Sequence, residues 1–380
     1  MRILRQAGYY VYKKICRVWP FATASNFLYC NVLNRCKEAY ILGPQQDKKL
    51  IRAAFLCDEM TWQDFRKECR SIFVTPRNWK HAFEEFSPQV FFCESAWSGI
   101  ESCRDCWRGR VYRSKNIRYE NRRELLDILG FCREKGITTV FWNKEDPTFF
   151  QNPDYDFVDT ALRFDYIFTS AEECIPGYQK LGHKRVSLLT FGFSPDIFYP
   201  KADLSQSNTA IFAGSWYNDQ PHRCLELEAL FDMVLEQGIE LIIYNRQSDS
   251  ANPLHRFPDR YRRYLRPKLP FEQLGEVFRQ SKYAININTV TDSNTMFARR
   301  VFELMACGCI VISNRSVGME CLFPQGIWIL DDAWKHMDEE HIRRNNLRMV
   351  FDKYTCGHLL NNVWKTIGIK DKVSDKGDNS

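Results

Sequence analysis

Long apolar runs are absent from this sequence of 380 residues. No window approaches the roughly 18 uninterrupted apolar residues that a membrane-spanning helix needs. The first residues also lack the apolar core of a secretory signal, because Lys13, Lys14 and Arg17 interrupt them. We therefore expect a cytoplasmic protein, either free or held at the inner face of the membrane.

Cysteine pairs at regular spacing are missing too, although the chain has 15 cysteines. The number is odd, the positions are scattered, and a chain of this length does not depend on disulfides for its stability. Cys103 and Cys106 form a lone CxxC with no second pair at zinc spacing, so we expect no metal site there. A reducing compartment fits this pattern better than an oxidising one.

The glycine-rich turn of a dinucleotide-binding domain is also absent. The first expected strand is Ile51–Cys57, and the segment Ala54–Thr61 around its end contains no glycine, so no GxGxxG follows the strand. This disfavours a general Rossmann-type nucleotide-binding protein. No repeat of solenoid period is visible, and no DxD-type pair stands in a convincing setting.

The sequence does contain two series of alternating strands and helices. The chain exceeds the usual ceiling of about 250–300 residues for one hydrophobic core, so two domains are expected. Strand patterns such as Ile137–Trp142 alternate with helical patterns such as Tyr119–Lys135, which predicts α/β domains with parallel, doubly wound sheets. We predict a basic N-terminal extension (1–47), a first Rossmann-like domain (48–192), a linker (193–207), a second Rossmann-like domain (208–345), C-terminal helices (346–369) and a disordered tail (370–380).

Basic residues concentrate in two segments, residues 1–20 and Arg256–Lys268, within a modest net charge of +6. Residues 1–20 interleave cations with aromatic and aliphatic side chains, as a helix in a membrane interface does. A helix packed on the protein is the alternative, because the apolar face is not cleanly separated. For Arg256–Lys268 the alternatives are a solvated surface and affinity for anionic lipid or for a phosphate-bearing substrate.

Three segments of the second series follow strands, which is where doubly wound sheets bind their ligands. The first segment holds Gly214 and Ser215, after the expected strand Thr209–Phe212. A glycine there lets backbone N–H groups approach a diphosphate, and Arg223 begins the next helix. A plain turn is the alternative.

The second segment is the loop Asn288–Thr295. Its hydroxyl and amide groups, with Asn294 among them, are candidates to bond sugar or phosphate oxygens. On the following helix Arg299 and Arg300 are candidates for phosphate, and Glu303 is a candidate for ribose because a carboxylate offers two acceptor oxygens. Alternatively, Arg299 and Glu303 lie at i,i+4 and simply pair on the surface.

The third segment is Asn314–Met319, after the expected strand Ile310–Ser313. Gly318 either marks another loop that approaches a ligand or belongs to a plain turn. The helix between the second and third segments is expected at Phe297–Ala306, where apolar residues recur at helical spacing.

In the first series, two carboxylates and a lysine follow the strand Ile137–Trp142. Glu145 or Asp146 is a candidate general base, which must lie near an acceptor hydroxyl. Lys144 would neutralise a phosphate or keep its neighbour ionised. The alternative is a helix cap and turn before Pro147.

The segment Glu94–Gly99 likewise follows a strand. Its Glu94 and Trp97 form either a sugar-stacking site or a loop that the tryptophan anchors.

The run Arg300–Asn314 (RVFELMACGCIVISN) resembles the donor-binding motif of GT-B glycosyltransferases, especially the CgeB-like (spore maturation) group and the related GT4 enzymes. The resemblance covers roughly residues 50–366. It implies two Rossmann-like domains facing a central cleft, with a C-terminal helix that returns to the first domain. It also implies that Glu303 binds the nucleotide ribose. Other segments that look like this group are Glu94–Gly99, Val140–Pro147, Phe164–Tyr178 and Phe212–Trp216.

One position departs from the GT4 pattern. GT4 enzymes usually carry another glutamate eight positions before the ribose glutamate, where it helps to hold the donor sugar, and Thr295 stands at that position here. The donor sugar and the retaining or inverting stereochemistry therefore stay open. The departure fits the CgeB-like group better than a standard GT4 enzyme.

The resemblance implies a hexosyltransferase-type enzyme that moves a sugar from a nucleotide sugar, a UDP-sugar above all, to a hydroxyl of a glycan or lipid-linked glycan. The second domain would hold the donor and the first the acceptor, in bacterial surface-polysaccharide, teichoic-acid-like or spore-coat glycan assembly. No nucleic-acid partner is expected. No obligatory metal is expected either, because GT-B enzymes commonly stabilise the leaving diphosphate with side chains and helix dipoles. The alternatives are a GT-B sugar-nucleotide epimerase and a non-catalytic GT-B subunit that binds nucleotide or glycan.

Overall fold

The computed structural model describes residues 41–44, 51–201, 206–324, 326–329 and 338–369. The basic segment predicted at residues 1–20 and the tail predicted at 370–380 lie outside these residues. The chain divides into two compact units: the first runs to Leu189 and takes in the residues from Leu360 onward, and the second is Thr190–Leu359. The return of the C-terminal residues to the first unit agrees with the expected GT-B chain path.

The first unit contains a seven-stranded sheet in the order β1-β3-β2-β4-β5-β6-β7. Only β1 is antiparallel, pairing with β3, and the other neighbours are parallel. The inner strands are buried along almost their whole length, as expected for a parallel sheet covered on both faces. The strands are β1 (Ile41–Leu42), β2 (Arg52–Leu56), β3 (Arg70–Phe73), β4 (Val90–Glu94), β5 (Thr138–Asn143), β6 (Tyr166–Thr169) and β7 (Val186–Leu188).

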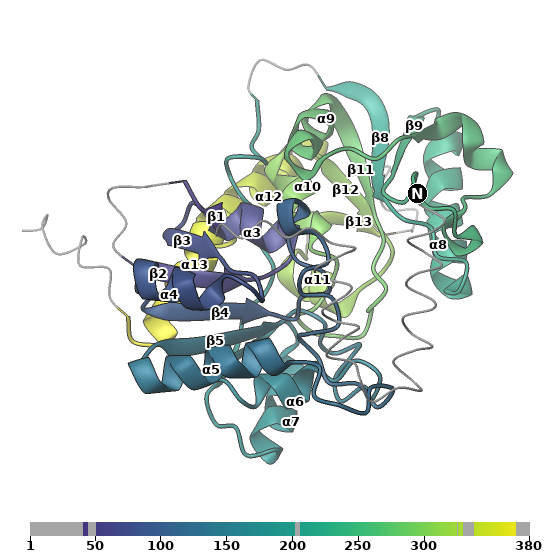
Figure 1. Cartoon of the computed structure of the whole chain (residues 1–380). Coiled ribbons are helices and arrows are strands. Elements are labelled where there is room, and N and C mark those ends of the chain that lie inside the picture. Colours follow the sequence, from purple (N-terminus) through teal and green to yellow (C-terminus); the bar gives the residue numbers. More distant parts are fainter. Residues whose placement is uncertain (1–40, 45–50, 202–205, 325, 330–337, 370–380) are drawn as a thin grey trace, which may run out of the picture. The chain divides into compact units, whose positions relative to one another are not determined.

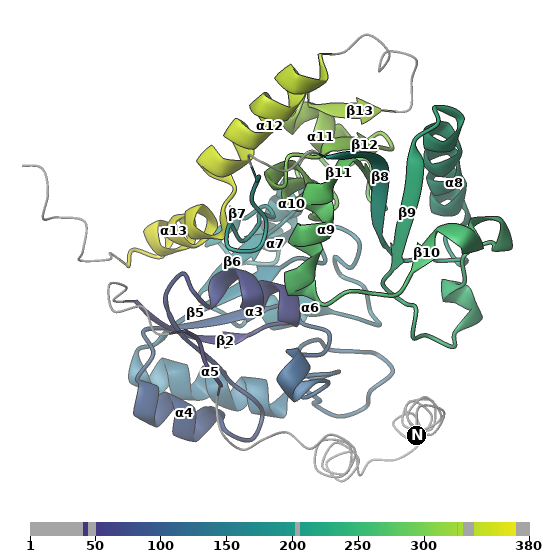
Figure 2. The ribbon, with the colours of Figure 1, turned by 90° about the horizontal axis from the view of Figure 1, so that it is seen from above.

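The helices of the first unit pack on the sheet largely through aromatic side chains. Trp79 and Phe83 of α4 (Trp79–Phe86) both contact the ring of Phe131 on α5 (Arg123–Lys135). Both helices are labelled in Figure 1, and Figure 2 shows them side by side. Helix α5 ends at Gly136, whose positive φ of 67° suits glycine and forms the C-terminal cap of the helix. The remaining helices are α3 (Glu59–Phe65), α6 (Phe157–Ala161) and α7 (Ile175–Lys180).

The second unit contains a six-stranded, fully parallel sheet in the order β10-β9-β8-β11-β12-β13. Strand β12 is buried throughout, and β8 and β11 are buried over residues 209–212 and 283–286, which is why their pattern is visible in the sequence. The short edge strands β10 and β13 were not predicted. The strands are β8 (Ser207–Gly214), β9 (Glu240–Asn245), β10 (Leu265–Arg266), β11 (Ser281–Asn286), β12 (Ile310–Ser313) and β13 (Ile327–Ile329).

Helix α8 (Pro221–Glu236) follows β8 and packs beside β9, as Figure 2 shows. Its buried Phe231 contacts Phe212 of β8 and Tyr261, which joins the helix to the sheet and to the segment after β9. Helix α10 (Arg300–Ala306) packs against α12 (Glu339–Lys353). The other helices are α9 (Leu274–Gln280), α11 (Val317–Leu322) and α13 (Cys356–Thr366).

Two further findings bear on the sequence predictions. In the described part of the chain, no helix combines the length and apolar character that a bilayer crossing requires. All described cysteines except Cys321 are buried, Cys103 and Cys106 among them.

Candidate functional site

The candidate donor site lies at the carboxyl ends of β8 and β11, which are neighbours in the middle of the second sheet. From β8 the strand order runs outward to β9 and β10, and from β11 it runs the other way to β12 and β13. Ligands of doubly wound sheets bind at this reversal of strand order, outside the carboxyl ends. The residues that follow β8, β9, β11 and β12 therefore define the site.

Gly214 ends β8, and packing explains why it is glycine. A Cβ at this position would lie 2.4 Å from Cζ of Phe212, whose ring is buried against Phe231. The next residue, Ser215, is 2% exposed. Gly214 and Ser215, both predicted, thus lie at the carboxyl end of β8. The Phe212 ring leaves no room for a side chain at position 214.

Arg223 lies in the first turn of α8 and points back to the end of β8. Its Nη1 donates to the carbonyl oxygen of Ser215 at 3.2 Å, and its guanidinium lies 5.0 Å from the centre of the Tyr217 ring. The residue is 9% exposed, and its buried Nε has no hydrogen-bond partner within the described residues. Burial lowers the pKa of this guanidinium, and the nearby charge of Arg246 acts in the same direction.

Arg246 was not predicted, although it directly follows β9. Its Nε donates to the hydroxyl of Ser215 at 3.2 Å, and its Nη2 donates to the hydroxyl of Tyr217 at 2.9 Å. Its exposed side chain can be reached by a ligand. The sequence shows only that Arg246 comes one residue after a strand. This position indicates a role in the site only when β9 is known to lie beside β8.

Arg299, Arg300 and Glu303 come together at the start of α10. The Nε of Arg299 donates to Oε1 of Glu303 at 2.9 Å, and Nη1 of Arg300 lies 3.2 Å from Oε2. Glu303 is 1% exposed. Arg299 and Glu303 therefore do pair, as the alternative from the sequence had it, but in the interior and not on the surface. Neither Nη1 of Arg300 nor Oε2 of Glu303 has a hydrogen-bond partner in the described part of the chain.

These side chains leave the site rich in positive charge. Among the described residues, no carboxylate lies within ion-pair distance of Arg223 or Arg246, and Glu303 alone pairs with Arg300. Burial lowers the pKa of Arg300, and the charges of Arg246 and Arg299 lower it further against the opposing effect of Glu303. An anion bound here would relieve this repulsion and satisfy buried N–H groups.

The loop after β11 is fixed by the buried amide of Asn288. Its Oδ1 accepts from the backbone N–H of Ala298 at 2.8 Å, and its Nδ2 donates to the hydroxyl of Ser313 at 3.2 Å. The regular helix begins at Arg300, three residues later than the predicted start at Phe297. Before it the chain turns through two i,i+3 bonds, from the Val301 N–H to the Ala298 carbonyl and from the Phe302 N–H to the Arg299 carbonyl, both at 3.2 Å. Asn288 thus sets the position of the helix that carries Arg300 and Glu303.

The structure brings Gly318 and the loop before α10 together. A Cβ on Gly318 would lie 3.1 Å from the carbonyl oxygen of Ser293 and 3.2 Å from that of Asn294. The Asn294 residue itself is exposed. Gly318 is therefore a close-packing position between two loops of the site.

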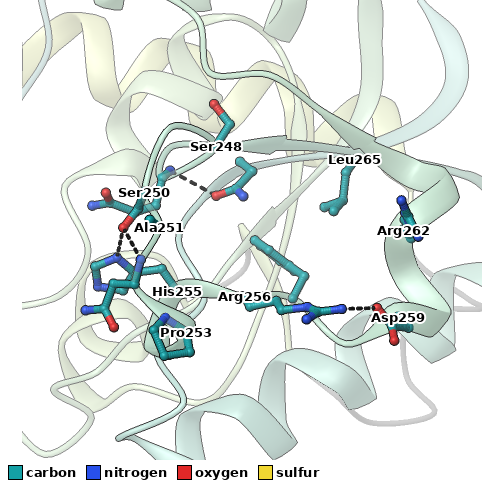
Figure 3. Close-up of a pocket in the computed structure, with 13 residues that line it drawn as sticks. Ser248, Ser250, Ala251, Pro253, His255, Arg256, Asp259, Arg262 and Leu265 are labelled. Atoms are coloured by element: carbon teal, nitrogen blue, oxygen red, sulfur yellow. Dashed lines mark hydrogen bonds and ion pairs between the residues drawn. The ribbon is translucent and has the colours of Figure 1, made fainter. Parts of the chain in front are cut away.

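A pocket of about 430 Å³ opens next to Arg246, between the end of β9 and the turns that follow it (Figure 3). Asn245 and Gln247, the chain neighbours of Arg246, both line it. One hydrogen bond across its rim joins the Ser250 hydroxyl to Nδ1 of His255 at 3.1 Å. The other lining residues are Ser248, Ala251, Asn252, Pro253, Arg256, Phe257, Asp259, Arg262 and Leu265.

The first unit has a corresponding polar cluster where β2 and β4 meet, at the reversal of strand order in its sheet. Glu94 ends β4 and is fully buried, and its Oε2 forms an ion pair with Nζ of Lys144 at 2.7 Å. The same Nζ donates to the hydroxyl of Thr61 at 3.0 Å. Burial raises the pKa of Glu94, and the charge of Lys144 opposes this rise. Lys144 is thus held by a carboxylate and a hydroxyl inside the unit.

Asp58, which follows β2, holds the segment Glu94–Gly99. Its carboxylate accepts from the backbone N–H groups of Trp97, Ser98 and Gly99 at 2.8, 2.9 and 2.6 Å. The Trp97 ring is half-buried and packs edge-on against Phe149, Tyr155 and Phe157. Of the two predicted roles, these contacts support the loop that the tryptophan anchors.

Glu145 and Asp146 have different surroundings. Asp146 is fully buried, and its carboxylate accepts from Nδ2 of Asn143 at 2.8 Å, from the Thr169 hydroxyl at 2.7 Å and from the Tyr178 hydroxyl at 2.9 Å. Burial raises the pKa of Asp146 to about 7 against these hydrogen bonds. Glu145 is half-buried, and burial raises its pKa while a hydrogen bond with the Trp97 side chain lowers it. The more accessible of the two carboxylates is therefore Glu145.

Residues 227–364 match a protein family described as Glycosyl transferase-like. No curated protein matches the chain in sequence. Among solved structures, a glycosyltransferase from Rickettsia africae has a TM-score of 0.51 at 8% identity, over 87% of this chain and 100% of that one. HepE from Anabaena, in complex with UDP-glucose, has a TM-score of 0.50 at 10% identity, over 84% of this chain and 100% of its own.

An alpha-glucosyltransferase in complex with UDP-glucose and DNA is similar to the same degree. Its TM-score is 0.51 at 11% identity, over 84% of this chain and 99% of that one. At such low identity these similarities establish the fold, and that fold is GT-B. The α/β fold class predicted from the sequence is confirmed. The match to the Glycosyl transferase-like family model covers most of the second unit.

Proposed function

We propose that this chain is a glycosyltransferase that moves a sugar from a UDP-sugar to a hydroxyl group of an acceptor. The observation that carries the proposal is the arginine cluster at the carboxyl ends of β8 and β11. There the side chains of Arg223 and Arg300 are largely buried, each has an unsatisfied nitrogen, and Arg246 stands exposed beside them. A diphosphate supplies the negative charge and the acceptor oxygens that this cluster lacks.

In the proposed reaction the bond between the sugar and the diphosphate breaks, and the diphosphate leaves with an added negative charge. Arg223, Arg246 and Arg300 stabilise that charge as it develops, which lowers the barrier more than it stabilises the intact donor. Oε2 of Glu303 has no hydrogen-bond partner among the described residues. In the proposed complex it accepts a hydrogen bond from a ribose hydroxyl. The nucleoside extends from Arg246 into the adjoining pocket, whose amide and hydroxyl groups suit a neutral base (Figure 3).

We assign the acceptor to the first unit and the general base to Glu145. A base must accept a proton from the acceptor hydroxyl, which requires contact with it. Glu145 is half-buried, and burial raises its pKa toward the range in which a carboxylate binds a proton readily. Asp146, the other predicted base, is fully buried, and its carboxylate already accepts three hydrogen bonds. We therefore assign it a structural role, which is to fix the segment that begins at Asn143.

Several finer features are part of the proposal and rest on the sequence resemblance alone. They are membership of the CgeB-like group, transfer of a hexose, a glycan or lipid-linked glycan acceptor, and a role in bacterial surface-polysaccharide, teichoic-acid-like or spore-coat glycan assembly. A cytoplasmic site of action, at or near the inner face of the membrane, belongs with them. So does the absence of a nucleic-acid acceptor, although one structural neighbour is bound to DNA.

The test is to incubate the purified chain with UDP-, GDP-, TDP- and CMP-sugars and to measure release of the nucleotide. We expect slow hydrolysis of a UDP-sugar that is lost in Glu303→Ala. The matched control is Arg348→Ala, which changes a highly exposed side chain on α12 and should keep wild-type activity. Release of an altered but intact nucleotide sugar would favour an epimerase, and stabilisation without turnover would favour a non-catalytic binding subunit.

A further inference from the structure

A second acidic side chain lies beside the arginine cluster and has no part in the function proposed so far. Glu226 is on α8, three positions after Arg223, so the two Cβ atoms are neighbours on one face of the helix, about 5–6 Å apart. Its side chain is 27% exposed. Glu226 therefore stands at the edge of the site, within reach of a ligand held by Arg223.

The Glu226 carboxylate is held in place from the opposite side of the site. Nδ2 of Asn314, which directly follows β12, donates to Oε2 of Glu226 at 3.1 Å. Asn314 is 2% exposed and its amide orientation is fixed by Asn288: Oδ1 accepts from the Asn288 N–H at 2.8 Å, and Nδ2 donates to the Asn288 carbonyl at 3.0 Å. The amide thus has one N–H left, and that N–H is directed at Glu226.

This arrangement leaves half of the carboxylate open. Within the described residues Oε1 of Glu226 has no hydrogen-bond partner, and no arginine or lysine pairs with the group. The other contact of Oε2 is Nδ1 of His222 at 3.5 Å, from a side chain that is 87% exposed. A carboxylate that is fixed through one oxygen and open at the other is suited to accept hydrogen bonds from hydroxyl groups of a ligand.

We propose that Glu226 binds hydroxyl groups of the donor sugar and so helps to select the sugar. The inference rests on the proposed function, because the sugar is bonded directly to the diphosphate that Arg223 holds. The base is assigned to the pocket beyond β9, so the sugar, at the opposite end of the diphosphate, is placed toward β12, where Glu226 and Asn314 lie. A sugar hydroxyl in this place donates to Oε1, for which the described residues provide no donor.

The experiment compares the affinities of UDP-glucose and UDP, measured by calorimetry, for the wild-type chain and for Glu226→Ala. UDP lacks the sugar, so we expect its dissociation constant to stay within about twofold, whereas that of UDP-glucose rises about tenfold or more. In Glu226→Gln the amide oxygen can take the place of Oε2 and accept from Asn314, so the side chain keeps its position and loses only the acceptor at its open end; we therefore expect a smaller loss. The control is His222→Ala, which removes the other neighbour of Oε2 and should change neither affinity.

Each other outcome has a definite reading. Equal loss of both affinities means that Glu226 only supports the structure of the site, and no loss of either means that the sugar does not contact it; both overturn the assignment. A wild-type chain that binds neither UDP nor UDP-glucose overturns the proposed function itself, which is a different result from a variant that fails. Circular dichroism of Glu226→Ala confirms that the variant is folded before its affinities are compared.

Discussion

Nη1 of Arg300 and Oε2 of Glu303 lie 3.2 Å apart in the interior of the second unit, yet neither atom has a hydrogen-bond partner among the described residues. Two buried charges with unmet hydrogen-bonding capacity are costly in free energy unless a ligand completes them. In the proposed complex, a ribose hydroxyl of the nucleotide sugar would donate to Oε2 of Glu303, and a diphosphate oxygen would accept from Nη1 of Arg300. Without a ligand, these two atoms raise the free energy of the folded protein and do not stabilise it. This arrangement is therefore consistent with a binding site.

The first prediction concerns the exposed member of the cluster. In Arg246→Gln one positive charge near the diphosphate is lost, so we expect the dissociation constant of UDP to rise about tenfold or more. The remaining affinity should depend less on ionic strength than that of the wild type, because one charge–charge contact has gone. Calorimetric titrations at low and high salt measure both effects. Arg348→Ala, on α12, is the control, and an equal loss of affinity in that variant would contradict the assignment.

The second prediction concerns the buried ion pair of the first unit. Lys144→Met removes the partner of the fully buried Glu94 carboxylate and should reduce the free energy of unfolding by about 3–5 kcal/mol. The double variant Glu94→Gln/Lys144→Met no longer buries a lone charge and should recover much of that loss. Urea denaturation of the wild type, the single variants Glu94→Gln and Lys144→Met, and the double variant gives the coupling free energy of the pair. Additive losses in the double variant would show that the pair has no such interaction.

The third prediction concerns pH. The pKa of Asp146 in the folded chain is raised from 3.8 to about 7, so the folded state binds a proton more tightly than the unfolded state. The free energy of unfolding therefore falls as the pH rises from about 4 to about 7 and changes no further above that range on account of this group. The pKa of Glu94 and that of Glu145 are raised as well, so both carboxylates contribute in the same direction. The difference between the wild type and Asp146→Asn isolates the part due to Asp146.

Chemical denaturation at several pH values measures this difference. In Asp146→Asn the decline of stability with pH should be shallower than in the wild type. Parallel curves for the two proteins would mean that Asp146 is ionised in the folded chain throughout this range.

The fourth prediction concerns the packing of Gly214 against the Phe212 ring. A Cβ in Gly214→Ala would lie 2.4 Å from the Phe212 ring, so we expect a loss of about 1–3 kcal/mol in stability from overpacking. Gly130 lies inside α5 with no atom within 4 Å of an added Cβ, so Gly130→Ala is the matched control. It should gain up to about 1 kcal/mol from the higher helix propensity of alanine. A thermal melt of each variant checks both signs.

The sequence predicts the central elements of both sheets well, because their strands are continuous apolar runs between polar turns. Ile310–Ser313 agrees with the structure to the residue, and Ile137–Trp142 is displaced by one residue from the observed strand Thr138–Asn143. The short edge strand Leu265–Arg266 has too few residues to produce a pattern and was not predicted. The start of α10 was predicted at Phe297 because that apolar residue continues the helical spacing; its ring is buried, but the regular helix begins only at Arg300.

The candidate site is only partly visible in the sequence. Gly214, Arg223 and Glu303 could be selected because each follows a strand or belongs to a recognisable motif. Arg246 and Glu226 could not, since their importance comes from the side chains they meet, Ser215 in one case and Asn314 in the other. Spacing alone also left open whether Glu303 pairs with Arg299 on the surface, and its burial resolves that question.

The most direct test of the central claim is a calorimetric titration of UDP-glucose into the wild-type chain and into Arg223→Gln/Arg246→Gln. The two side chains meet at Ser215, so the double variant removes the charge from one place in the site. We predict saturable binding at one site per chain for the wild type and a loss of affinity of at least about a hundredfold for the double variant. Equal affinities for the two proteins, with both folded by circular dichroism, would contradict a donor site at the carboxyl ends of β8 and β11.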